Sequence, residues 1–535
     1  MTPSEAKSQS WDVIIIGAGM GGGLAGRRLA ERGLSVLFLE KGREGHRTEQ
    51  QPYSPTLADP MARQLRGFWP KPVEEHNGAL VSRYFAPLGC GVGGSSVFYA
   101  AALERPEPHD LDNVYGTQHP TGGWPIGFSD FLPYFHQAED ILYVRGDADD
   151  LSDIPSPKLR PPPELTEQEA AMMADFRNRG LHPYYSHIAQ KRLANCANCL
   201  GGKCPRACKM DGRSAGVEPA LESGKAAILT ECEVEQLLEE TAGKISGVMV
   251  RHRGETVILK AETYILAAGS FGSPTLLLRS IGQSGSGCAN SSGWVGRGLM
   301  FHINNFFAVW PRRGQKPIGR SRAISTRDFY LHKGHRLGLI QSMGYEADYG
   351  TIMYFLLMQF ERSRFAKSTK LRRLLNIPAL IATKLFGNAD VFVAQLEDFP
   401  MAANRVVLNK QDPDVFTFHY SVSQDVFPRQ IALRRAIRRA VGWWRMTFLS
   451  TKPIVNVGHP IGTLRFGTDP TSSVLDPDCR AHDVENLYVA DGSFMPTSMG
   501  VNPSLTIAAN ALRVADVIAE RKKKHATEKG MQHDR

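Results

Sequence analysis

The chain of 535 residues contains no run of 18 uninterrupted apolar residues, so it predicts no transmembrane helix. Its first ten residues, MTPSEAKSQS, are polar and lack the apolar core of a secretory signal peptide. Both absences predict a cytoplasmic protein, and thiols stay reduced in that compartment. The eight cysteines are therefore interpreted as free thiols or metal ligands rather than as disulfides.

The sequence also lacks internal repeats and the zinc-finger, RNA-recognition and basic-zipper patterns of nucleic-acid-binding proteins. We therefore expect no nucleic-acid partner. The formal net charge of +9 instead suits an anionic membrane surface or an acidic partner. With 42% apolar and 22% charged residues, the composition is that of a globular protein, and the length allows two domains.

The first 40 residues predict a dinucleotide-binding unit. Residues 12–16 and 35–39 form apolar runs typical of buried strands, and residues 25–33 suit a helix. The glycines between the strands form a GxGxxG pattern, which permits a tight turn, backbone approach to a pyrophosphate and close helix packing. An acid at the end of the second strand can accept hydrogen bonds from ribose hydroxyls. These residues are Gly17, Gly19, Gly22 and Glu40.

Three further segments predict contacts with the same cofactor. Residues 87–106 form a second glycine-rich loop, and residues 264–282 read as a strand, a turn at Gly269 and a helix opened near Pro274. Residues 485–516 read as a strand, a turn and a helix with Asn502 as N-cap and Pro503 at its first position. That helix would direct its positive end at a flavin. The additional cofactor contacts that we expect are Gly93, Gly94, Ser95, Val234, Asp491, Gly492, Asn502 and Pro503.

The chain resembles the glucose–methanol–choline (GMC) oxidoreductase family. The resemblance rests on GAGMGGGLAGRRLAE, GVGGSSVFYAAALERP, ILAAGSFGSPTLLLRSIG, VGRGLMFH, HPIGTLRFG and VADGSFMPTSMGVNPSLT, which follow the family's order over nearly the whole chain. It implies FAD rather than NAD. The VNPSLTI stretch leans toward the cholesterol-oxidase branch, and FAD-dependent dehydrogenases form the other related branch.

The family resemblance also implies the fold and the domain organisation. We expect an α/β fold with a Rossmann-like FAD-binding domain assembled from several chain segments, beside an α+β substrate-binding domain. The FAD domain would comprise residues 11–105, 190–300 and 455–522, and the substrate domain residues 106–189 and 301–454. Residues 523–535 would form a flexible tail. Some members carry a histidine that tethers FAD where this chain has Val97-Phe98-Tyr99, so non-covalent FAD is expected.

The resemblance implies a catalytic pair. His459 stands at the position of the family's active-site histidine, and Asn502 at a position where members carry His or Asn. A neutral imidazole can accept the hydroxyl proton of an alcohol, and an amide can hold its oxygen. Taken alone, a histidine before proline is more often a structural turn residue, but the surrounding motifs favour catalysis. His482 is interpreted as structural.

Four cysteines fall within 13 residues in the pattern C-x2-C-x4-C-P-x2-C: Cys196, Cys199, Cys204 and Cys208. Such thiols can ligate an iron–sulfur cluster or zinc, or remain free. Among GMC relatives, FAD-dependent glucose dehydrogenases hold a cluster in a comparable segment, whereas other members carry cysteines there without metal. A cluster would make the protein a dehydrogenase that passes electrons to a protein partner.

Residues 360–386 interleave basic and apolar side chains. One interpretation is a pair of amphipathic helices in the cap of the substrate domain. The other is an interfacial segment that makes weak peripheral contact with anionic lipid on the inner face of the membrane. Pro378 interrupts any single long helix.

The sequence thus predicts FAD-dependent oxidation of the CH–OH group of a small-molecule alcohol, with a hydrophobic alcohol or sterol as substrate. One alternative is a flavoprotein similar to the GMC-type hydroxynitrile lyases, without net redox chemistry. Another is a sugar dehydrogenase that exports electrons through an iron–sulfur cluster. A third is a non-catalytic flavoprotein partner, against which the intact pair of His459 and Asn502 argues.

Overall fold

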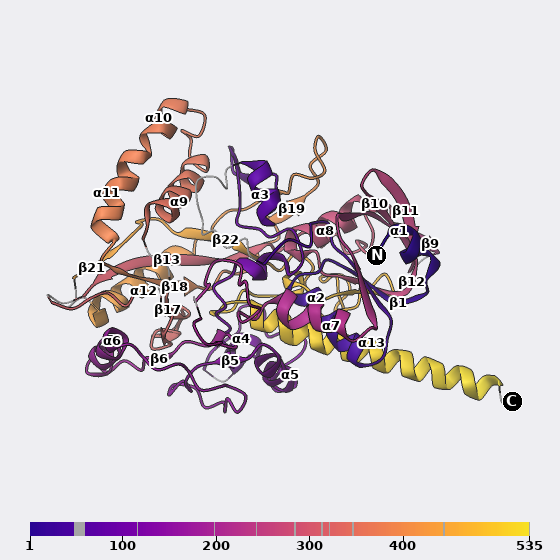
Figure 1. Ribbon diagram of the computed structural model, residues 1–535, viewed down its shortest axis with the longest axis horizontal. Helices are drawn as coiled ribbons and strands as arrows, with labels where there is room; N and C mark the ends of the chain where they lie inside the picture. The colour runs from indigo at the N-terminus through magenta and orange to yellow at the C-terminus, as the bar shows by residue number, and fades with distance from the viewer. Residues whose placement is uncertain are drawn as a thin grey trace.

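The computed structural model describes residues 1–47, 59–114, 116–196, 198–241, 243–282, 285–311, 314–319, 321–344, 347–441 and 445–533. A five-stranded parallel sheet lies at one end of the molecule, in the order β23-β12-β1-β2-β8 (Figure 1). Its strands come from distant parts of the chain: Trp11–Ile16 (β1), Val36–Leu39 (β2), Ala226–Leu229 (β8), Ala261–Leu266 (β12) and Leu487–Val489 (β23). This arrangement confirms the Rossmann-like part of the predicted fold.

Helix α2 (Met20–Glu31) begins inside the glycine motif, five residues before the predicted helix. Its glycines allow this early start because they bring the helix backbone against its neighbours. A Cβ on Gly22 would lie 2.1 Å from the carbonyl oxygen of Gly17 and 3.1 Å from Ile15. Since real Cβ atoms do not approach that closely, position 22 requires glycine for the contact between α2 and β1.

A second, seven-stranded sheet has the order β21-β13-β18-β17-β14-β6, with β22 also paired to β13. Its central antiparallel pair is β13 (Met300–Trp310) with β18 (Asp390–Leu396). The other strands are β6 (Tyr184–Tyr185), β14 (Ile324–Thr326), β17 (Ile340–Ser342), β21 (Arg445–Phe448) and β22 (Ile454–Ile461). One face of β13 packs toward α12 (Val426–Val441), where Gln430 donates a hydrogen bond to Asn305. The opposite face is available to a ligand.

Smaller sheets complete the fold. An antiparallel three-stranded sheet contains β9 (Cys232–Thr241), β10 (Lys244–His252) and β11 (Glu255–Leu259). A four-stranded sheet contains β3 (Val73–Asn77), β4 (Leu80–Tyr84), β19 (Arg405–Val407) and β20 (Thr417–His419). Two short pairs are β5 (Val144–Arg145) with β7 (Ile188–Ala189) and β15 (Leu331–His332) with β16 (His335–Arg336).

The sheets cross the predicted domain borders at two places. Strand β22 pairs with β13 of the seven-stranded sheet, although nearly all of β22 lies in the predicted FAD-domain segment 455–522. Strands β3 and β4 lie in the predicted FAD domain, but β3 pairs with β20 of the predicted substrate domain and β4 pairs with β3. The exact division of the chain therefore stays a prediction.

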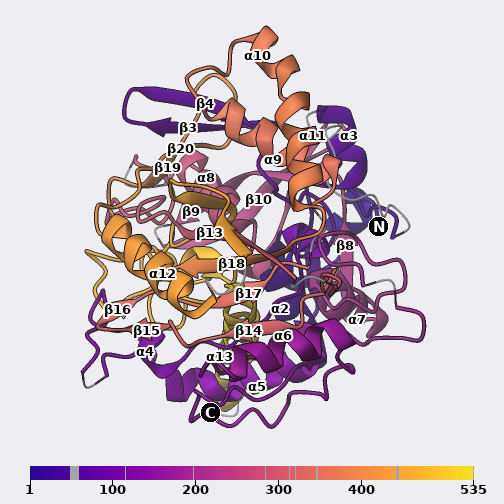
Figure 2. The ribbon, with the colours of Figure 1, turned by 90° about the vertical axis from the view of Figure 1, so that its left-hand side faces the viewer.

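The helices cover both sheets (Figures 1 and 2). Besides α2 and α12 they are α1 (Pro3–Ser8), α3 (Pro60–Arg66), α4 (Pro108–Leu111), α5 (Phe128–Ile141), α6 (Glu167–Arg177), α7 (Glu218–Glu222), α8 (Gly269–Arg279), α9 (Tyr349–Glu361), α10 (Thr369–Leu374), α11 (Asn376–Phe386) and α13 (Ser504–His533). Short helical turns are η2 (Gly94–Phe98), η3 (Gly212–Val217) and η4 (Gly492–Phe494). Among the described residues, no helix has the length and apolar character needed to span a bilayer.

Two helix boundaries differ from the sequence prediction. Helix α8 begins at Gly269 and contains Pro274, which we expected near its start. Proline removes the hydrogen bond to the carbonyl of Ser270, and that carbonyl accepts one from the Thr463 hydroxyl at 2.8 Å instead. Helix α13 continues to His533, so the described part of the expected tail is helical, and its flexibility stays a prediction.

Candidate active site

A cavity of about 850 Å³ is lined by residues of both large sheets. It brings together segments that are hundreds of residues apart in the chain, including His459 and Asn502. Most of the predicted cofactor contacts line the same cavity: Gly17, Gly19, Glu40, Gly94, Ser95, Val234, Asp491, Gly492, Asn502 and Pro503. Two predicted contacts, Gly22 and Gly93, do not line it. Gly22 packs α2 against β1, and Gly93 donates its N–H to the carbonyl of Ala18 at 2.7 Å.

Glu40 lies buried at the end of β2, where its carboxylate is held by the backbone. Its two oxygens accept hydrogen bonds from the N–H groups of Ala18, at 3.0 Å, and Gly42, at 2.8 Å. Burial raises the pKa of the Glu40 carboxyl, and these backbone donors oppose that effect. A carboxylate has about four acceptor positions, so beside the backbone donors of Ala18, Gly42 and Gly91 the side chain can still accept a hydroxyl donor from a ribose.

Two helix N-termini face the cavity. Helix α2 starts there after Gly19, and α13 starts there at Ser504. Exposed N–H groups and the helix dipole make such ends favourable for anionic groups. Asp491, which caps η4, accepts a hydrogen bond from the Gly269 N–H at 2.8 Å and so joins the α8 and β23 segments. The donors present fit the phosphates and ring carbonyls of a dinucleotide cofactor.

His459 contacts a second histidine, His302. Their Nδ1 atoms are 3.2 Å apart and the rings are nearly perpendicular. His302 lies on β13 and His459 on β22, in a bulge between the pairs His302–Asn456 and Met300–Ile461. One strand advances two residues there while the other advances five, so the ladder is interrupted. Pro460 fits this bulge because it has no N–H to donate.

The environment keeps His459 neutral. Its pKa is held well below the usual value by loss of hydration, and repulsion from His302 and Arg322 lowers it further. Burial lowers the pKa of His302 to about 4, although backbone interactions with Met499, Val501 and Ser498 act in the opposite direction. At neutral pH both histidines are therefore uncharged, and one ring can donate a hydrogen bond to the other.

Asn502 does not cap the helix that follows it, contrary to the prediction. Its side-chain oxygen accepts a hydrogen bond from Gln341 Nε2 at 3.0 Å, and helix α13 begins at Ser504. The bond to Gln341 fixes the amide because Gln341 is itself buried on β17. With its oxygen engaged, Asn502 presents its Nδ2 donors to the cavity that it lines.

Alternate residues of β13 and β18 form one wall of the cavity. Asn304 and Phe306 belong to β13, and Val391, Val393 and Gln395 to β18. Asn304 lies directly opposite Gln395, and neither Asn304 Oδ1 nor Gln395 Oε1 has a hydrogen-bond partner among the described residues. A buried amide oxygen without a partner is costly, so both atoms fit a ligand that carries donor groups.

Helices α9 and α11 form the wall opposite that sheet. Tyr354, Phe355 and Met358 of α9 and Phe386 of α11 line the cavity. Phe355 also contacts Phe306 edge-on, with 6.1 Å between ring centroids. These side chains make this wall of the cavity apolar.

The four clustered cysteines gather beside the cofactor loop. Cys208 Sγ lies 3.3 Å from Cys204 Sγ and 3.9 Å from Cys196 Sγ. A hydrogen bond from Cys199 lowers the pKa of Cys204 to about 4. Within the described residues, however, no group of three or more His, Cys, Asp or Glu side chains is arranged to hold a metal ion. The four thiols are therefore close to one another, but they are not arranged as the ligands of a metal ion.

Two other residues behave as side chains of the framework. The hydroxyl of Tyr99 donates to the carbonyl of Met210, so it ties η2 to the cysteine segment while the residue lines the cavity. His482 Nε2 lies 3.0 Å from Ser473 Oγ, and this histidine does not line the cavity. His482 therefore lies where its structural interpretation requires.

The sequence did not single out His302, Gln341, Gln395, Asn304 or Arg322. All five come from strands or loops of the second sheet, whose pairing places them in or beside the cavity. His302 ends the segment VGRGLMFH, which carried part of the family resemblance, and this was the one available signal.

Comparison with known families agrees with this site. Two domains described as GMC oxidoreductase match residues 20–304 and 443–511. The first of these alone covers more than half of the chain. The protein belongs to the GMC oxidoreductase family, whose enzymes bind FAD and act on CH–OH groups.

Curated and solved relatives extend over nearly the whole chain. It is 26% identical to 6'''-hydroxyparomomycin C oxidase of Streptomyces lividus over 95% of this chain and 91% of the relative. It is 27% identical to 2-methyl-1,2-propanediol dehydrogenase of Mycolicibacterium austroafricanum, with 95% of each chain covered. The structure of a formate oxidase variant from Aspergillus oryzae superimposes with a TM-score of 0.66 at 16% identity, covering 97% of this chain and 99% of the other. This last likeness concerns the fold alone.

Proposed function

We propose that this protein oxidises an alcohol to a carbonyl compound with non-covalently bound FAD, and that His459 is the base. The observation that carries the proposal is the cavity, which places His459 and Asn502 in the lining shared by the glycine-rich loops and Glu40. When bound, FAD supplies the hydride acceptor. The glycine loops, Glu40 and the N-termini of α2 and α13 would hold it.

The side chains around His459 support a defined tautomer. His302 Nε2 is buried and has no hydrogen-bond partner among the described residues, while the nearby backbone of Ser498, Met499 and Val501 acts to raise the pKa of His302. In this proposal Nε2 carries the N–H of the His302 ring. His302 Nδ1 then accepts a hydrogen bond from His459 Nδ1–H across the 3.2 Å contact. This leaves the lone pair of His459 on Nε2, where it accepts the hydroxyl proton of the substrate.

Asn502 positions the substrate in this proposal. Gln341 holds the amide oxygen, so Nδ2 donates to the alcohol oxygen and orients the C–H bond that breaks. The same donor stabilises negative charge that develops on that oxygen as its proton moves to His459. Arg322 adds positive charge on the same side of the cavity, since it lowers the pKa of His459.

The cavity favours an alcohol with an apolar body. Its walls on α9, α11 and β18 carry Phe355, Phe386 and Val393, whereas Asn304 and Gln395 offer acceptors for a further donor group. The two curated relatives are named as an oxidase of a hydroxylated paromomycin and a dehydrogenase of a diol, which supports a hydroxyl group as the reacting group. We propose a hydrophobic alcohol, sterols included, as the substrate class.

The test of this function is anaerobic reduction of the bound flavin by a panel of alcohols. We expect the flavin absorbance near its visible maximum to bleach with an apolar primary or secondary alcohol and to return on admission of an electron acceptor. A lyase would leave the flavin oxidised while it cleaved a cyanohydrin. Bleaching by none of the alcohols, with cyanohydrin cleavage present, would establish the lyase alternative.

The cofactor itself gives a prediction. Purified protein should be yellow and should release FAD on denaturation, because no histidine follows the GGSS loop. Gly22→Val should abolish FAD binding, since a Cβ at that position would lie 2.1 Å from the Gly17 carbonyl oxygen. Gly33→Asn is the matched control, because nothing lies within 4 Å of a Cβ there and asparagine tolerates the positive φ. Flavin that stays with the precipitated protein would contradict non-covalent binding.

A second candidate function is an electron-exporting dehydrogenase. It is favoured by the proximity of the thiols and by Lys209, whose buried Nζ donates to the carbonyls of Val97 and Tyr99 and so joins the cysteine segment to η2. In this alternative, Cys196, Cys199, Cys204 and Cys208 hold an iron–sulfur cluster that passes electrons to an acceptor protein.

Metal analysis decides between the two candidates. For the dehydrogenase, anaerobically purified protein is expected to contain iron and acid-labile sulfide, and Cys204→Ser should remove both while FAD stays bound. Cys288→Ser is a matched control, because Cys288 is buried outside the cysteine segment. Zinc in place of iron, or protein free of metal after anaerobic purification, would reject the cluster and leave the four thiols free.

A further inference from the structure

Helices α10 and α11 carry an unusual density of exposed apolar side chains. Of the 22 large apolar side chains that are exposed in the described residues, seven lie between residues 365 and 385. Each of the seven is between 42% and 56% exposed: Phe365, Leu371, Leu374, Ile377, Leu380, Ile381 and Leu385. The two helices project from the body of the molecule, at the top of the views in Figures 1 and 2. Many apolar side chains of this segment are therefore exposed and do not pack against the rest of the substrate domain.

Helix α11 is apolar on two opposite sides. Its inner side packs on α9 through buried Ala379 and lines the cavity with Ala382 and Phe386. Its outer side carries a stripe at the spacing i, i+3, i+4 and i+8: Ile377, Leu380, Ile381 and Leu385. A helix on the surface of a globular protein needs only one apolar stripe, so the outer stripe has no role in folding that the described residues show.

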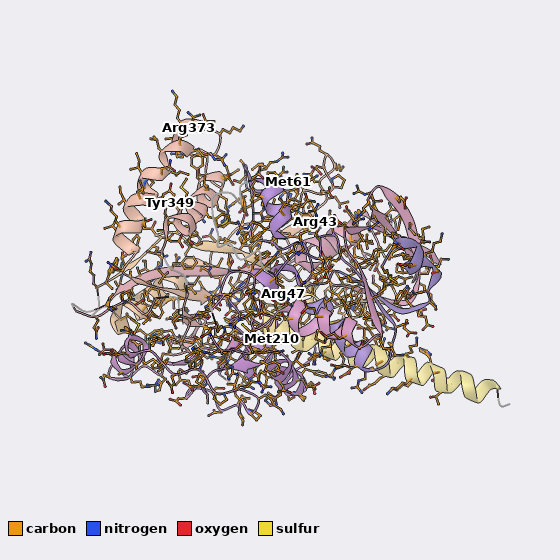
Figure 3. The ribbon with its side chains drawn as sticks, viewed as in Figure 1. Arg43, Arg47, Met61, Met210, Tyr349 and Arg373 are labelled. Atoms are coloured by element: carbon orange, nitrogen blue, oxygen red, sulfur yellow. The ribbon has the colours of Figure 1, made fainter. Side chains whose placement is uncertain are left out.

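The exposed stripe is surrounded by positive charge alone. Residues 362–389 contain seven basic and no acidic side chains. Arg362 pairs with Glu75 at 2.9 Å, and Arg372 with Glu361 at 3.4 Å. The other five are exposed and form no ion pair with the described residues: Arg364, Lys367, Lys370, Arg373 and Lys384. Arg373 extends from the tip of the projection (Figure 3).

We propose that α10 and α11 dock on an anionic membrane surface. Apolar side chains would enter the headgroup region while the lysines and arginines contact lipid phosphates and carboxylates, as in interfacial helices. Charge complementarity selects this occupant. A second copy of the chain would place seven basic residues against seven others, which repel, and water alone would leave the apolar stripe unsatisfied.

Helix α11, which carries the proposed docking surface, also forms part of the cavity wall. Ala382 and Phe386 of α11 face the cavity from one side of the helix whose other side carries the exposed stripe. On the basis of the proposed function, the membrane is therefore the source of the alcohol, and the substrate class is a membrane-resident alcohol with an apolar body. The docking step does not depend on the chemistry and can be tested without it.

Vesicle flotation of the holoenzyme tests the docking. Binding should require phosphatidylserine in phosphatidylcholine vesicles and should fall as salt rises. The triple variant Lys367→Glu, Lys370→Glu, Arg373→Glu should lower the partition coefficient by at least about 100-fold, because each basic group near an anionic surface contributes about fivefold. The double variant Ile377→Ser, Ile381→Ser should also weaken binding without any change of charge.

A charge-matched control uses Lys7→Glu, Lys523→Glu, Lys524→Glu. These three lysines are exposed on α1 and α13, and the substitutions change the net charge by the same amount. The control should float like the wild type. Equal binding to neutral and anionic vesicles, no binding at low salt, or equal loss in both triple variants would overturn the proposal. If the wild type self-associates without binding vesicles, and the variant Lys367→Glu, Lys370→Glu, Arg373→Glu does not self-associate, the surface would instead be an interface with a second copy of the chain.

The catalytic half of the inference has a separate readout. The His459→Ala variant should float like the wild type, so flotation stays informative even if the alcohol chemistry is wrong. With active enzyme, the α10 triple variant should oxidise a vesicle-borne alcohol more slowly and a short water-soluble alcohol at the wild-type rate. Equal rates of the wild type and of the variant Lys367→Glu, Lys370→Glu, Arg373→Glu on the vesicle-borne alcohol would show that the membrane does not deliver the substrate.

Discussion

Replacing His459 by alanine is expected to leave FAD bound and to slow flavin reduction by an alcohol by about 10²-fold or more. This is the usual range for loss of a general base. The imidazole accepts the hydroxyl proton, whereas the loops that would hold the cofactor do not depend on it. Anaerobic stopped-flow absorbance measures the rate, and FAD released on denaturation measures the occupancy.

The rate of flavin reduction should also depend on pH in a defined direction. Loss of hydration, followed by repulsion from His302 and Arg322, holds the pKa of His459 well below its usual value, so the base stays neutral as pH falls through the range in which an ordinary histidine protonates. The acid limb of the flavin-reduction profile should therefore lie well below pH 6.5, the usual pKa of a free histidine side chain.

His482→Ala is the matched control for His459→Ala. His482 contacts Ser473 and lies outside the cavity, so its loss should leave flavin reduction unchanged. Wild-type rates in His459→Ala would place the base on another residue. An equal loss of rate in both variants would show that the effect comes from the fold and not from the cavity.

Local patterns allowed the cofactor end of the site to be predicted. The glycines and Glu40 lie on one continuous strand–turn–helix–strand unit, whose geometry follows from spacing alone. Gly17, Gly19 and Glu40 line the cavity together with residues near 270 and 491, because parallel pairing of β1 with β12, and of β12 with β23, brings these loops to one edge. The family resemblance implied that several distant chain segments assemble this domain.

The substrate end depended on pairings that the sequence does not show. Asn304 and Gln395 lie opposite each other only because β13 pairs with β18 across about 90 residues of chain. Gln341 reaches Asn502 by a similar route, and its hydrogen bond draws the Asn502 oxygen away from the helix end where a cap was expected. Tertiary contacts therefore replaced the local capping preference.

The exposed stripe of α11 illustrates a different limit. The sequence of residues 360–386 fitted both a packed cap and an interfacial segment, because both require apolar residues at helical spacing. Only the placement of α11 on α9 separates Ala379, which is buried, from Leu380 and Ile381, which are more than half exposed. Periodicity predicts that a helix has faces but not which neighbour covers each of them.

His302 is expected to act as a positioning residue for His459. Replacing it by leucine should keep FAD bound and lower the rate of flavin reduction by about 10²-fold. The reason is that His459 would no longer be held with its lone pair on Nε2. Loss of the tautomer-fixing partner in a Ser-His-Asp triad costs about 10⁴-fold, because the histidine then adopts the wrong tautomer. His302→Gln retains an acceptor near the same position and should recover part of the rate.

The pH profile separates positioning from a purely structural role. His302 contributes to lowering the pKa of His459, so its removal should move the acid limb of the profile upward. A packing defect would lower the rate at every pH without that shift, and glutamine would not rescue it. An unshifted acid limb together with equal rates in His302→Leu and His302→Gln would contradict the positioning role, because the 3.2 Å contact between the two Nδ1 atoms would then carry no hydrogen bond that matters for proton transfer.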